Sequence, residues 1–213
     1  MGIIVLGSYL SPYTLRVLIE LEELGVDYEL KLVNLKQGEH RTPEFLKMQP
    51  FGQVPVLQDD DLTLFESRAI TRYLAEKFDG QGTPLLGKSM KEKALVNQWV
   101  EVESQNYDRP LISIVEQVVW TPSWGKTTNE EIVAAEMAKL EKVLDVYEAQ
   151  LTKHKYLAGD FFSLADLGHL PGTHLLVNIG KKGAVFAARP HLNAWWEDIS
   201  SRPSFKKIMA KTP

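Results

Sequence analysis

The segment that most constrains the fold runs from Phe51 to Ile70 and reads FGQVPVLQDDDLTLFESRAI. Its apolar run VPVL, its three aspartates and its alternating run LTLF predict a strand, a turn and a second strand. Apolar residues then recur at helical spacing as far as Leu74, so we expect a helix that begins with Ser67 as its N-cap. The backbone N–H groups at the start of such a helix favour a bound anion.

Pro55 lies where the first of these strands begins. Because proline lacks the N–H that a sheet ladder uses, we expect Pro55 at the start of the strand or in a cis turn. A cis bond would turn the N–H and C=O of Val54 outward, where an extended peptide could pair with them. A peptide with a carboxylate would suit both this backbone and the helix start, although a plain hairpin followed by a capped helix fits the same pattern.

Composition and charge exclude several functions. The 213 residues, 44% of them hydrophobic, suffice for a buried core in one large domain or two smaller ones. The net charge of −4 gives no footprint for nucleic acid, and no apolar run is long enough for a signal peptide or a membrane span. The chain has no cysteine, and its five histidines form no metal-binding pair, so we expect no metal. We expect a soluble protein of a reducing compartment such as the cytoplasm.

The first part of the chain alternates strand and helix patterns. Ser11 followed by Pro12 is a favoured helix start, and Gly25 is a favoured helix end. With the segment described above, the predicted order is strand, helix, strand, short helix, strand, strand, helix, which matches a small thioredoxin-like α/β domain. The elements predicted before the central segment cover residues 3–6, 12–24, 28–35 and 43–48.

Strand patterns disappear beyond Ser89, and apolar residues then recur at helical spacing. Pro110 should kink the first long helix, and Ser163 with Asp166 forms a capping-box pattern. The predicted helices cover residues 90–120 and 128–151, a segment that begins at 163, and residues 191–200 and 203–209, with a break at 121–125. A turn-rich stretch at 79–84 marks the boundary, so we expect a thioredoxin-like domain over 1–80, a linker over 81–88 and an all-helical domain over 89–213.

The pieces FGQVP and LFESRAI resemble the glutathione-binding stretch of the glutathione transferases, and in particular that of the plant phi class. The likeness extends along nearly the whole chain, as far as the AWWEDISSRPS segment near its end. It implies the glutathione transferase fold, in which an α/β thioredoxin-like domain precedes an all-α domain that contributes a hydrophobic substrate pocket. It also implies a cytoplasmic homodimer that uses glutathione as a co-substrate and holds no tightly bound cofactor.

Ser11 is the residue that the resemblance places at the catalytic serine position. A thiol has a pKa of about 8.5 and is mostly protonated at neutral pH. A hydroxyl donor at a helix start stabilises the thiolate through a hydrogen bond and through the helix dipole. The same serine would also serve as a plain helix cap, and Tyr9 and Tyr13 are rivals because other transferase classes use a tyrosine near this strand end. The phi-like motifs favour Ser11.

The resemblance assigns further residues to the other groups of glutathione. Glu66 would bind the ammonium of the γ-glutamyl end, and Ser67 with the helix amides would bind its carboxylate. The remaining matches are Gln53 and Val54 at the cysteinyl backbone, Pro55 as the cis residue, and His40 and Arg41 at the glycine carboxylate, where lysine is more usual than arginine.

A hydrophobic electrophile would bind between the two domains, in a pocket formed by the turn before the first helix and by one face of the long helix. Each candidate residue, taken singly, fits a core position at least as well as a pocket position. The candidates are Leu10, Pro12, Tyr13, Tyr107, Leu111, Val115, Val118 and Trp120.

These features together predict an enzyme that conjugates the glutathione thiolate to hydrophobic electrophiles in detoxification. Glutathione-dependent peroxidase activity would be a second use of the same thiolate. The alternative is a non-catalytic carrier of flavonoid-like or other hydrophobic ligands, and a purely structural role is a distant third. Retention of Ser11 favours the enzyme over the carrier.

Overall fold

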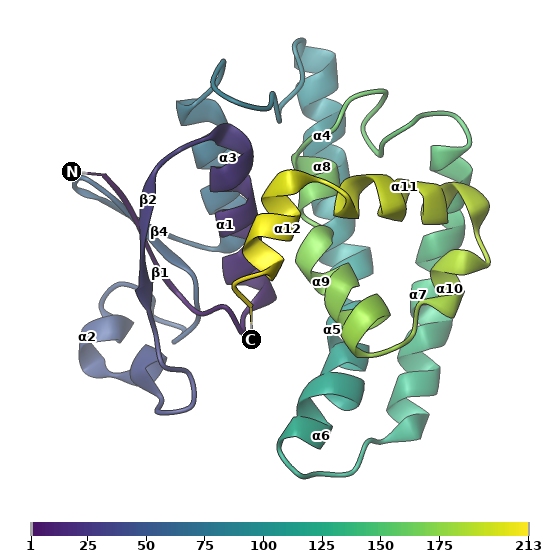
Figure 1. The fold of residues 1–213 in the computed structure, drawn as a ribbon, viewed down its shortest axis with the longest axis horizontal. Helices are drawn as coiled ribbons and strands as arrows, with labels where there is room; N and C mark the ends of the chain where they lie inside the picture. The colour runs from purple at the N-terminus through teal and green to yellow at the C-terminus, as the bar shows by residue number, and fades with distance from the viewer. Residues whose placement is uncertain (1, 213) are drawn as a thin grey trace. The chain divides into compact units, whose positions relative to one another are not determined.

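The computed structural model describes residues 2–212, and Figure 1 shows them as a ribbon. The chain divides into two compact units, one made of Met1–Leu85 with Arg202–Pro213 and the other of Leu86–Ser201. We call these unit 1 and unit 2. The sequence placed all of residues 89–213 in the helical domain, whereas the structure groups residues 202–213 with the first part of the chain.

Unit 1 is built on a four-stranded sheet of β1 (Ile3–Gly7), β2 (Tyr28–Leu32), β3 (Val56–Asp59) and β4 (Leu62–Phe65). The strand order is β2-β1-β3-β4, with β1 parallel to β2 and with β3 antiparallel to both β1 and β4. Neighbouring residues of a strand point to opposite faces, and both Val56 and Leu57 are completely buried. Both faces of the central sheet are therefore covered.

β2 ends at Leu32, short of the predicted end at Leu35. The Glu39 carboxylate accepts a hydrogen bond from the Asn34 N–H at 2.6 Å, and the Asn34 side chain accepts one from the Gln37 N–H at 3.2 Å. These local bonds satisfy the backbone in a loop instead of a strand. The alternating pattern alone could not show this competition.

α1 (Pro12–Leu24) begins and ends where the sequence predicted. Ser11 is its N-cap, with Oγ accepting a hydrogen bond from the Thr14 N–H at 3.3 Å. Gly25 ends the helix at a φ of 65°, in the left-handed region that glycine adopts at little cost. The apolar face of the helix is completely buried at Val17, Leu18 and Leu21.

α3 (Ser67–Lys77) and the short α2 (Pro43–Leu46) complete the helices in the first part of unit 1. Thr42 is the N-cap of α2, which ends at Leu46, short of the predicted end at residue 48. The prediction of Ser67 as the cap of α3 is wrong, because Glu66 is the N-cap and Ser67 is the first helical residue. Glu66 has a φ of 71°, and this left-handed turn lets the helix begin directly after β4.

The last helix, α12 (Pro203–Met209), belongs to unit 1 because its start is bound to Glu23 of α1. Arg202 donates to the Glu23 carboxylate through Nε and Nη2, both at 2.7 Å, and the Ser204 hydroxyl donates to the same carboxylate. The Thr83 hydroxyl adds a further bond at 2.7 Å. This buried cluster attaches the end of the chain to the first helix of unit 1.

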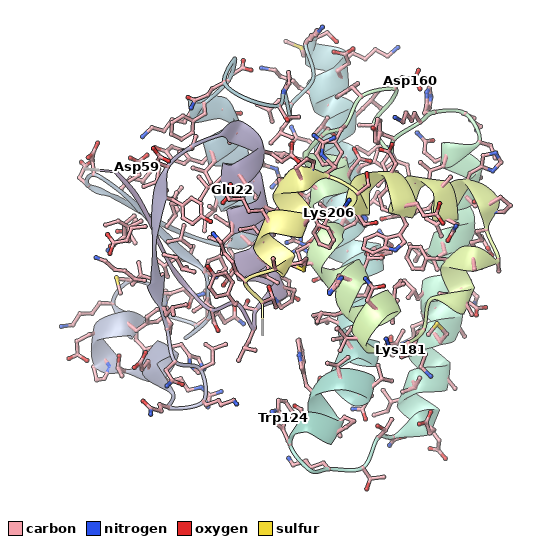
Figure 2. The ribbon with its side chains drawn as sticks, in the orientation of Figure 1. Glu22, Asp59, Trp124, Asp160, Lys181 and Lys206 are labelled. Carbon is pink, nitrogen blue, oxygen red and sulfur yellow. The ribbon has the colours of Figure 1, made fainter. Side chains whose placement is uncertain are left out.

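A second contact between the same two helices lies at the surface. Lys207 of α12 donates to the Glu22 carboxylate of α1 at 2.6 Å. Figure 2 labels Glu22 and, on α12, the preceding residue Lys206. Exposed ion pairs contribute only about 0–1 kcal/mol. The Glu23 cluster is therefore the main polar attachment of α12.

Unit 2 consists of helices joined by turns, with one isolated bridge between Tyr156 and Gly159. Within residues 2–212, no helix is long and apolar enough to cross a membrane. The elements in chain order are α4 (Met90–Val102), a π-helical segment (Glu103–Tyr107), α5 (Asp108–Val115), a second π-helical segment (Glu116–Trp120), α6 (Thr121–Ser123), α7 (Glu130–Leu151), α8 (Leu164–Leu167), α9 (Leu170–His174), a third π-helical segment (Leu175–Ile179), α10 (Ala184–Ala187) and α11 (Pro190–Ser200).

The first long helical run differs from the prediction at its end. It was predicted to break from residue 121, but it continues through the second π-helical segment as far as Ser123, and Gly125 ends it at a φ of 72°. The proline expected to kink the run, Pro110, lies in α5 soon after the first π-helical segment. A proline ring removes one ladder bond, and a π-helical segment is one way for a helix to adjust nearby.

Asp166 is the polar centre of unit 2. The predicted capping box is present, because the Ser163 N–H donates to Asp166 Oδ2 at 3.0 Å. The Leu157 N–H and the Trp195 indole N–H donate to Oδ1 at 3.0 and 2.9 Å. Burial raises the pKa of Asp166 to about 6 in spite of these bonds. One carboxylate thus joins the start of α8, the preceding loop and α11.

Candidate functional site

The residues predicted to bind glutathione all lie in unit 1, and the sheet register brings their segments to one edge. Leu6 of β1 pairs with Val56 of β3, and Val56 pairs with Phe65 of β4. The end of β1, the start of β3 and the end of β4 are therefore neighbours. Consequently the turn before α1, the Val54–Pro55 bond and the start of α3 lie side by side.

The turn between β1 and α1 is held tightly. A Cβ atom at Gly7 would lie only 2.4 Å from Thr14 Cγ2, so this position needs glycine. The Ser8 N–H donates to Thr14 Oγ1 at 3.3 Å, and the Ser11 N–H donates to the Ser8 carbonyl at 3.0 Å. These contacts fix the position of Ser11 relative to the end of the strand.

Ser11 can cap its helix and still donate a hydrogen bond. Its side chain is buried, with 7% of the residue exposed, and Oγ accepts from the Thr14 N–H. A hydroxyl has one proton and two lone pairs, so this bond leaves the proton for another acceptor. The positive end of the α1 dipole lies at the same place. The two roles considered for Ser11 are therefore compatible.

The segment before β3 is organised by Gln49, a residue that the sequence analysis did not single out. Its buried side-chain oxygen accepts from the Phe51 N–H at 2.7 Å and from the Gln53 N–H at 3.2 Å. The Val54–Pro55 bond is cis, as predicted. The role of Gln49 could have been predicted from one sequence feature, an amide side chain just before the turn-forming PFG sequence.

The 3-10 turn Glu39–Arg41 lies against this segment, because a Cβ atom on Gly52 would lie 3.1 Å from the His40 carbonyl oxygen. Burial and the charge of Arg41 lower the pKa of His40, so its ring is neutral at pH 7. Positive charge at this turn therefore comes from Arg41, which is exposed. His40 Nδ1 is buried and has no hydrogen-bond partner among the described residues.

Glu66 and Ser67 stand at the start of α3. Glu66 is exposed and has a φ of 71°, which few residues other than glycine adopt. Such backbone strain costs about 1–3 kcal/mol and is concentrated at functional sites. Ser67 is buried, and Arg16 Nη1 donates to its Oγ at 2.9 Å. Arg16 lies on α1 and was not singled out by the sequence analysis either.

The side chains of these segments are hydroxyls, amides, a carboxylate, an imidazole and two guanidinium groups. Within residues 2–212 there is no group of three or more His, Cys, Asp or Glu that could hold a metal ion. Hydroxyl, guanidinium and helix N–H donors suit carboxylates, and a lone exposed carboxylate suits an ammonium. The chemistry of the set therefore fits a zwitterionic peptide.

The residues predicted to line a hydrophobic pocket differ in exposure. In unit 1, Leu10 is 48% exposed. In unit 2, the Tyr107 hydroxyl bonds Thr173 at 2.7 Å and its ring stacks on Tyr147, so Tyr107 is packed inside the unit. Of the others, Pro12, Leu111 and Val115 are buried, and Tyr13, Val118 and Trp120 are half-buried. Their place in a substrate pocket stays a prediction.

Comparisons with known proteins agree with the fold. The model of the glutathione S-transferase N-terminal domain matches residues 1–76, and that of the C-terminal domain matches residues 111–203. The chain is similar to glutathione S-transferase F10 of Arabidopsis thaliana, with 48% identity over 196 residues, which cover 92% of this chain and 91% of the relative.

Solved structures of glutathione transferases are also similar to this chain. Glutathione transferase F7 from Populus trichocarpa is 50% identical, with a TM-score of 0.96 and 99% of both chains covered. Maize glutathione S-transferase I in complex with an atrazine glutathione conjugate is 45% identical, with a TM-score of 0.90 and 99% of this chain and 97% of that one covered. The chain therefore belongs to the glutathione S-transferase family. Within the family, it is a transferase of the plant phi class.

Proposed function

We propose that this protein is a serine-type transferase, in which Ser11 stabilises the glutathione thiolate for attack on hydrophobic electrophiles. The observation that carries the proposal is the position of the Ser11 hydroxyl. It caps α1 at the sheet edge shared by the Val54–Pro55 bond and the start of α3, and it keeps a proton to donate. No cysteine is present to compete for this role.

The stabilisation expected from the Ser11 hydroxyl and the helix start is large enough to ionise the thiol of bound glutathione near neutral pH. A hydrogen bond to a charged group contributes about 1.5–3 kcal/mol, and a helix N-terminus adds about 0.3–1 kcal/mol. Since 1.36 kcal/mol corresponds to one pKa unit, together they lower the thiol pKa by roughly 1–3 units from about 8.5. A substantial fraction of bound glutathione is then thiolate at neutral pH.

The rest of the tripeptide has partners along the same edge. The backbone of Val54 would pair with the cysteinyl residue beside Gln53, and Pro55 would hold that backbone in place. Glu66 and Ser67 would bind the γ-glutamyl ammonium and carboxylate. His40 and Arg41 would bind the glycine carboxylate, where Arg41 supplies the charge. These contacts position the sulfur at Ser11.

The reaction needs only positioning and anion stabilisation. The thiolate forms a carbon–sulfur bond with the electrophile, and a leaving group departs with the electron pair of the bond that breaks. A solved structure shows the related maize enzyme in complex with an atrazine glutathione conjugate, which supports aromatic electrophiles as the substrate class. The candidates with exposed side-chain surface are Leu10 and Tyr13 in unit 1 and Val118 and Trp120 in unit 2.

The same thiolate would reduce organic hydroperoxides. It attacks the peroxide oxygen, which yields an alcohol and a sulfenic acid, and a second glutathione then gives the disulfide and water. We also propose a cytoplasmic homodimer, on the grounds of the family resemblance. Sedimentation velocity measures the oligomeric state, and a monomer at micromolar concentration would contradict this part.

The test is conjugation of glutathione to dinitrochlorobenzene by the wild type and by Ser11→Ala. Loss of the donor should raise the pKa of the bound thiol by about 1–2 units, which is followed by thiolate absorbance. The rate at neutral pH should fall roughly 10–100-fold. Ser11→Thr keeps both the cap and the proton and should restore most of the rate.

Ser89→Ala is the matched control, because it removes an N-cap hydroxyl from α4 in unit 2. It should cost about 1 kcal/mol of stability and leave the thiol pKa unchanged. Equal thiol pKa values in the wild type and Ser11→Ala would refute the role of Ser11. Binding of glutathione with no turnover of dinitrochlorobenzene or of cumene hydroperoxide would instead support the carrier.

A further inference from the structure

Arg16 is a buried cation on α1, with 4% of the residue exposed. Its Nη1 donates to the Oγ of Ser67 at 2.9 Å, across 51 positions of sequence. Burying a guanidinium costs free energy unless its donors are satisfied. A cation held against the first residue of α3 therefore indicates that Arg16 has a function at the start of that helix.

The direction of this hydrogen bond decides what Ser67 can do. A guanidinium carries five N–H donors and no acceptor, so Ser67 Oγ must be the acceptor. The one hydroxyl proton of Ser67 is then left to point elsewhere. A bond received from a cation also polarises the hydroxyl and makes it a stronger donor. Arg16 thereby turns Ser67 into a fixed donor next to the N–H groups of α3.

We propose that Arg16 is a positioning residue for the γ-glutamyl carboxylate of glutathione, acting through the hydroxyl of Ser67. This inference rests on the proposed function, in which Ser67 binds that carboxylate. Arg16 need not touch the substrate, because its effect passes through the orientation and polarisation of one hydroxyl. The residue would select peptides that carry a free α-carboxylate at their γ-linked end.

The neighbours of Arg16 are consistent with this role. Its guanidinium lies 5.6 Å from the centre of the Tyr13 ring, which contributes a cation–π contact. Glu20 lies one turn further along α1, but among the described residues neither of its carboxylate oxygens has a hydrogen-bond partner. Burial also raises the pKa of Glu20, which weakens its hold on a cation. The cation is thus not tied to this acid by a hydrogen bond.

Arginine suits this place better than lysine. Its planar fork can donate to Ser67 from one nitrogen while its other donors bind elsewhere, whereas a lysine ammonium is a point charge on a flexible stem. Arg16→Lys should therefore keep the fold and weaken glutathione binding by a smaller factor than Arg16→Gln. The two variants give a graded series.

The experiment is a double-mutant cycle with Arg16→Gln, Ser67→Ala and the double variant, in which the Kd of glutathione is measured by calorimetry. Each single variant should weaken binding about 10-fold or more. The double variant should bind no more weakly than Ser67→Ala, because Arg16 has nothing left to orient. The KM for glutathione should rise while kcat at saturation stays within about 3-fold of the wild type.

A glutathione analogue without the γ-glutamyl carboxylate, γ-aminobutyryl-cysteinylglycine, supplies a readout that general damage would not give. It should bind the wild type and Arg16→Gln with equal affinity. Arg202→Gln is the matched control, because it removes another hydrogen-bonded guanidinium of unit 1 and should lower Tm while leaving the Kd of glutathione unchanged.

The outcomes distinguish the role of Ser67 in the proposed function from the role of Arg16. Unchanged glutathione affinity in Ser67→Ala would refute the assignment of Ser67 in the proposed function. A loss in Ser67→Ala together with multiplicative losses in the double variant would overturn the role of Arg16 alone. If Arg16→Gln does not fold, the same cycle is run with Arg16→Lys, and an equal loss for glutathione and for the analogue would overturn the inference.

Discussion

Gly7 and Ser11 are separated by a single turn, and the first determines where the second stands. The missing side chain at Gly7 admits Thr14 of α1 against the end of β1. Thr14 in turn accepts from the Ser8 N–H and donates its own N–H to Ser11. At the scale of single residues, the proposed thiolate site therefore depends on a contact between a glycine and a threonine.

We predict that Gly7→Ala damages both stability and catalysis. The new Cβ would lie 2.4 Å from Thr14 Cγ2 and 2.7 Å from its Oγ1, so strand and helix must move apart. Overpacking of this kind costs about 1–3 kcal/mol, measured by urea unfolding. The conjugation rate should fall further than the stability explains. Adding Thr14→Ala should recover part of the stability, and a neutral Gly7→Ala would contradict the steric argument.

Asp166 illustrates what one carboxylate does at the scale of secondary-structure elements. It caps α8 through Ser163, holds the preceding loop through Leu157 and reaches α11 through Trp195. These elements are short or far apart in sequence, and none would be positioned by its own apolar face alone. The capping box predicted from the sequence is thus one part of a larger junction.

Asp166→Ala is expected to lower the free energy of unfolding by about 3–5 kcal/mol. The substitution leaves buried donors on Leu157, Ser163 and Trp195 without their acceptor, and each orphaned donor costs about 1–3 kcal/mol. Urea titration followed by Trp fluorescence measures the change. The control is Asn129→Ala, which removes the exposed N-cap of α7 and should cost about 1 kcal/mol. Equal costs for the two variants would rule out the proposed junction.

At the scale of the whole molecule, Glu23 closes the chain on itself. Its carboxylate accepts hydrogen bonds from Arg202 and Ser204, which lie 179 and 181 positions away, and from Thr83 beyond α3. The first helix, the segment after α3 and the last helix are thereby held in one unit. The exposed Lys207–Glu22 ion pair joins the same two helices across 185 positions.

The Glu23 cluster predicts an acid sensitivity with a definite sign. Burial raises the pKa of Glu23, but the hydrogen bonds from Arg202, Ser204 and Thr83 outweigh it and lower the pKa below the ordinary 4.5. Its stabilisation is therefore complete above pH 4.5 and is lost as the pH falls through the pKa of the folded state. In Glu23→Gln, Tm should start lower at pH 7 and fall less steeply toward pH 3. Parallel Tm profiles for the two proteins would exclude this origin of the acid sensitivity.

Arg202→Ala tests the same cluster from the other side. It leaves the buried Glu23 carboxylate without its cation, which costs about 3–5 kcal/mol for a buried pair. Lys139→Ala removes the exposed pair with Glu136 and should cost less than about 1 kcal/mol. Urea unfolding compares the two, and a loss in Arg202→Ala as small as that in Lys139→Ala would contradict a stabilising role for the cluster.

Local signals explain where the sequence predicted structure well. Ser11, Pro12 and Gly25 bound α1 through bonds and dihedral preferences that involve only nearby residues. The predicted end of β2 and the predicted cap of α3 were wrong because competing local bonds at Asn34 and a left-handed Glu66 left no periodic trace. Gln49 and Arg16 were missed for a related reason, since each acts on a group that the sequence pattern does not reveal.

The sequence by itself determined the order of the elements, the two kinds of domain, the family and the residues expected to meet glutathione. These follow from short-range propensities and from motifs such as FGQVP and LFESRAI. Only the tertiary structure decided that three strand ends form one edge, that Arg16 bonds Ser67 and that α12 joins unit 1. Strand register and buried polar bonds join residues that are far apart in sequence, and their cost and gain exist only once the chain has packed.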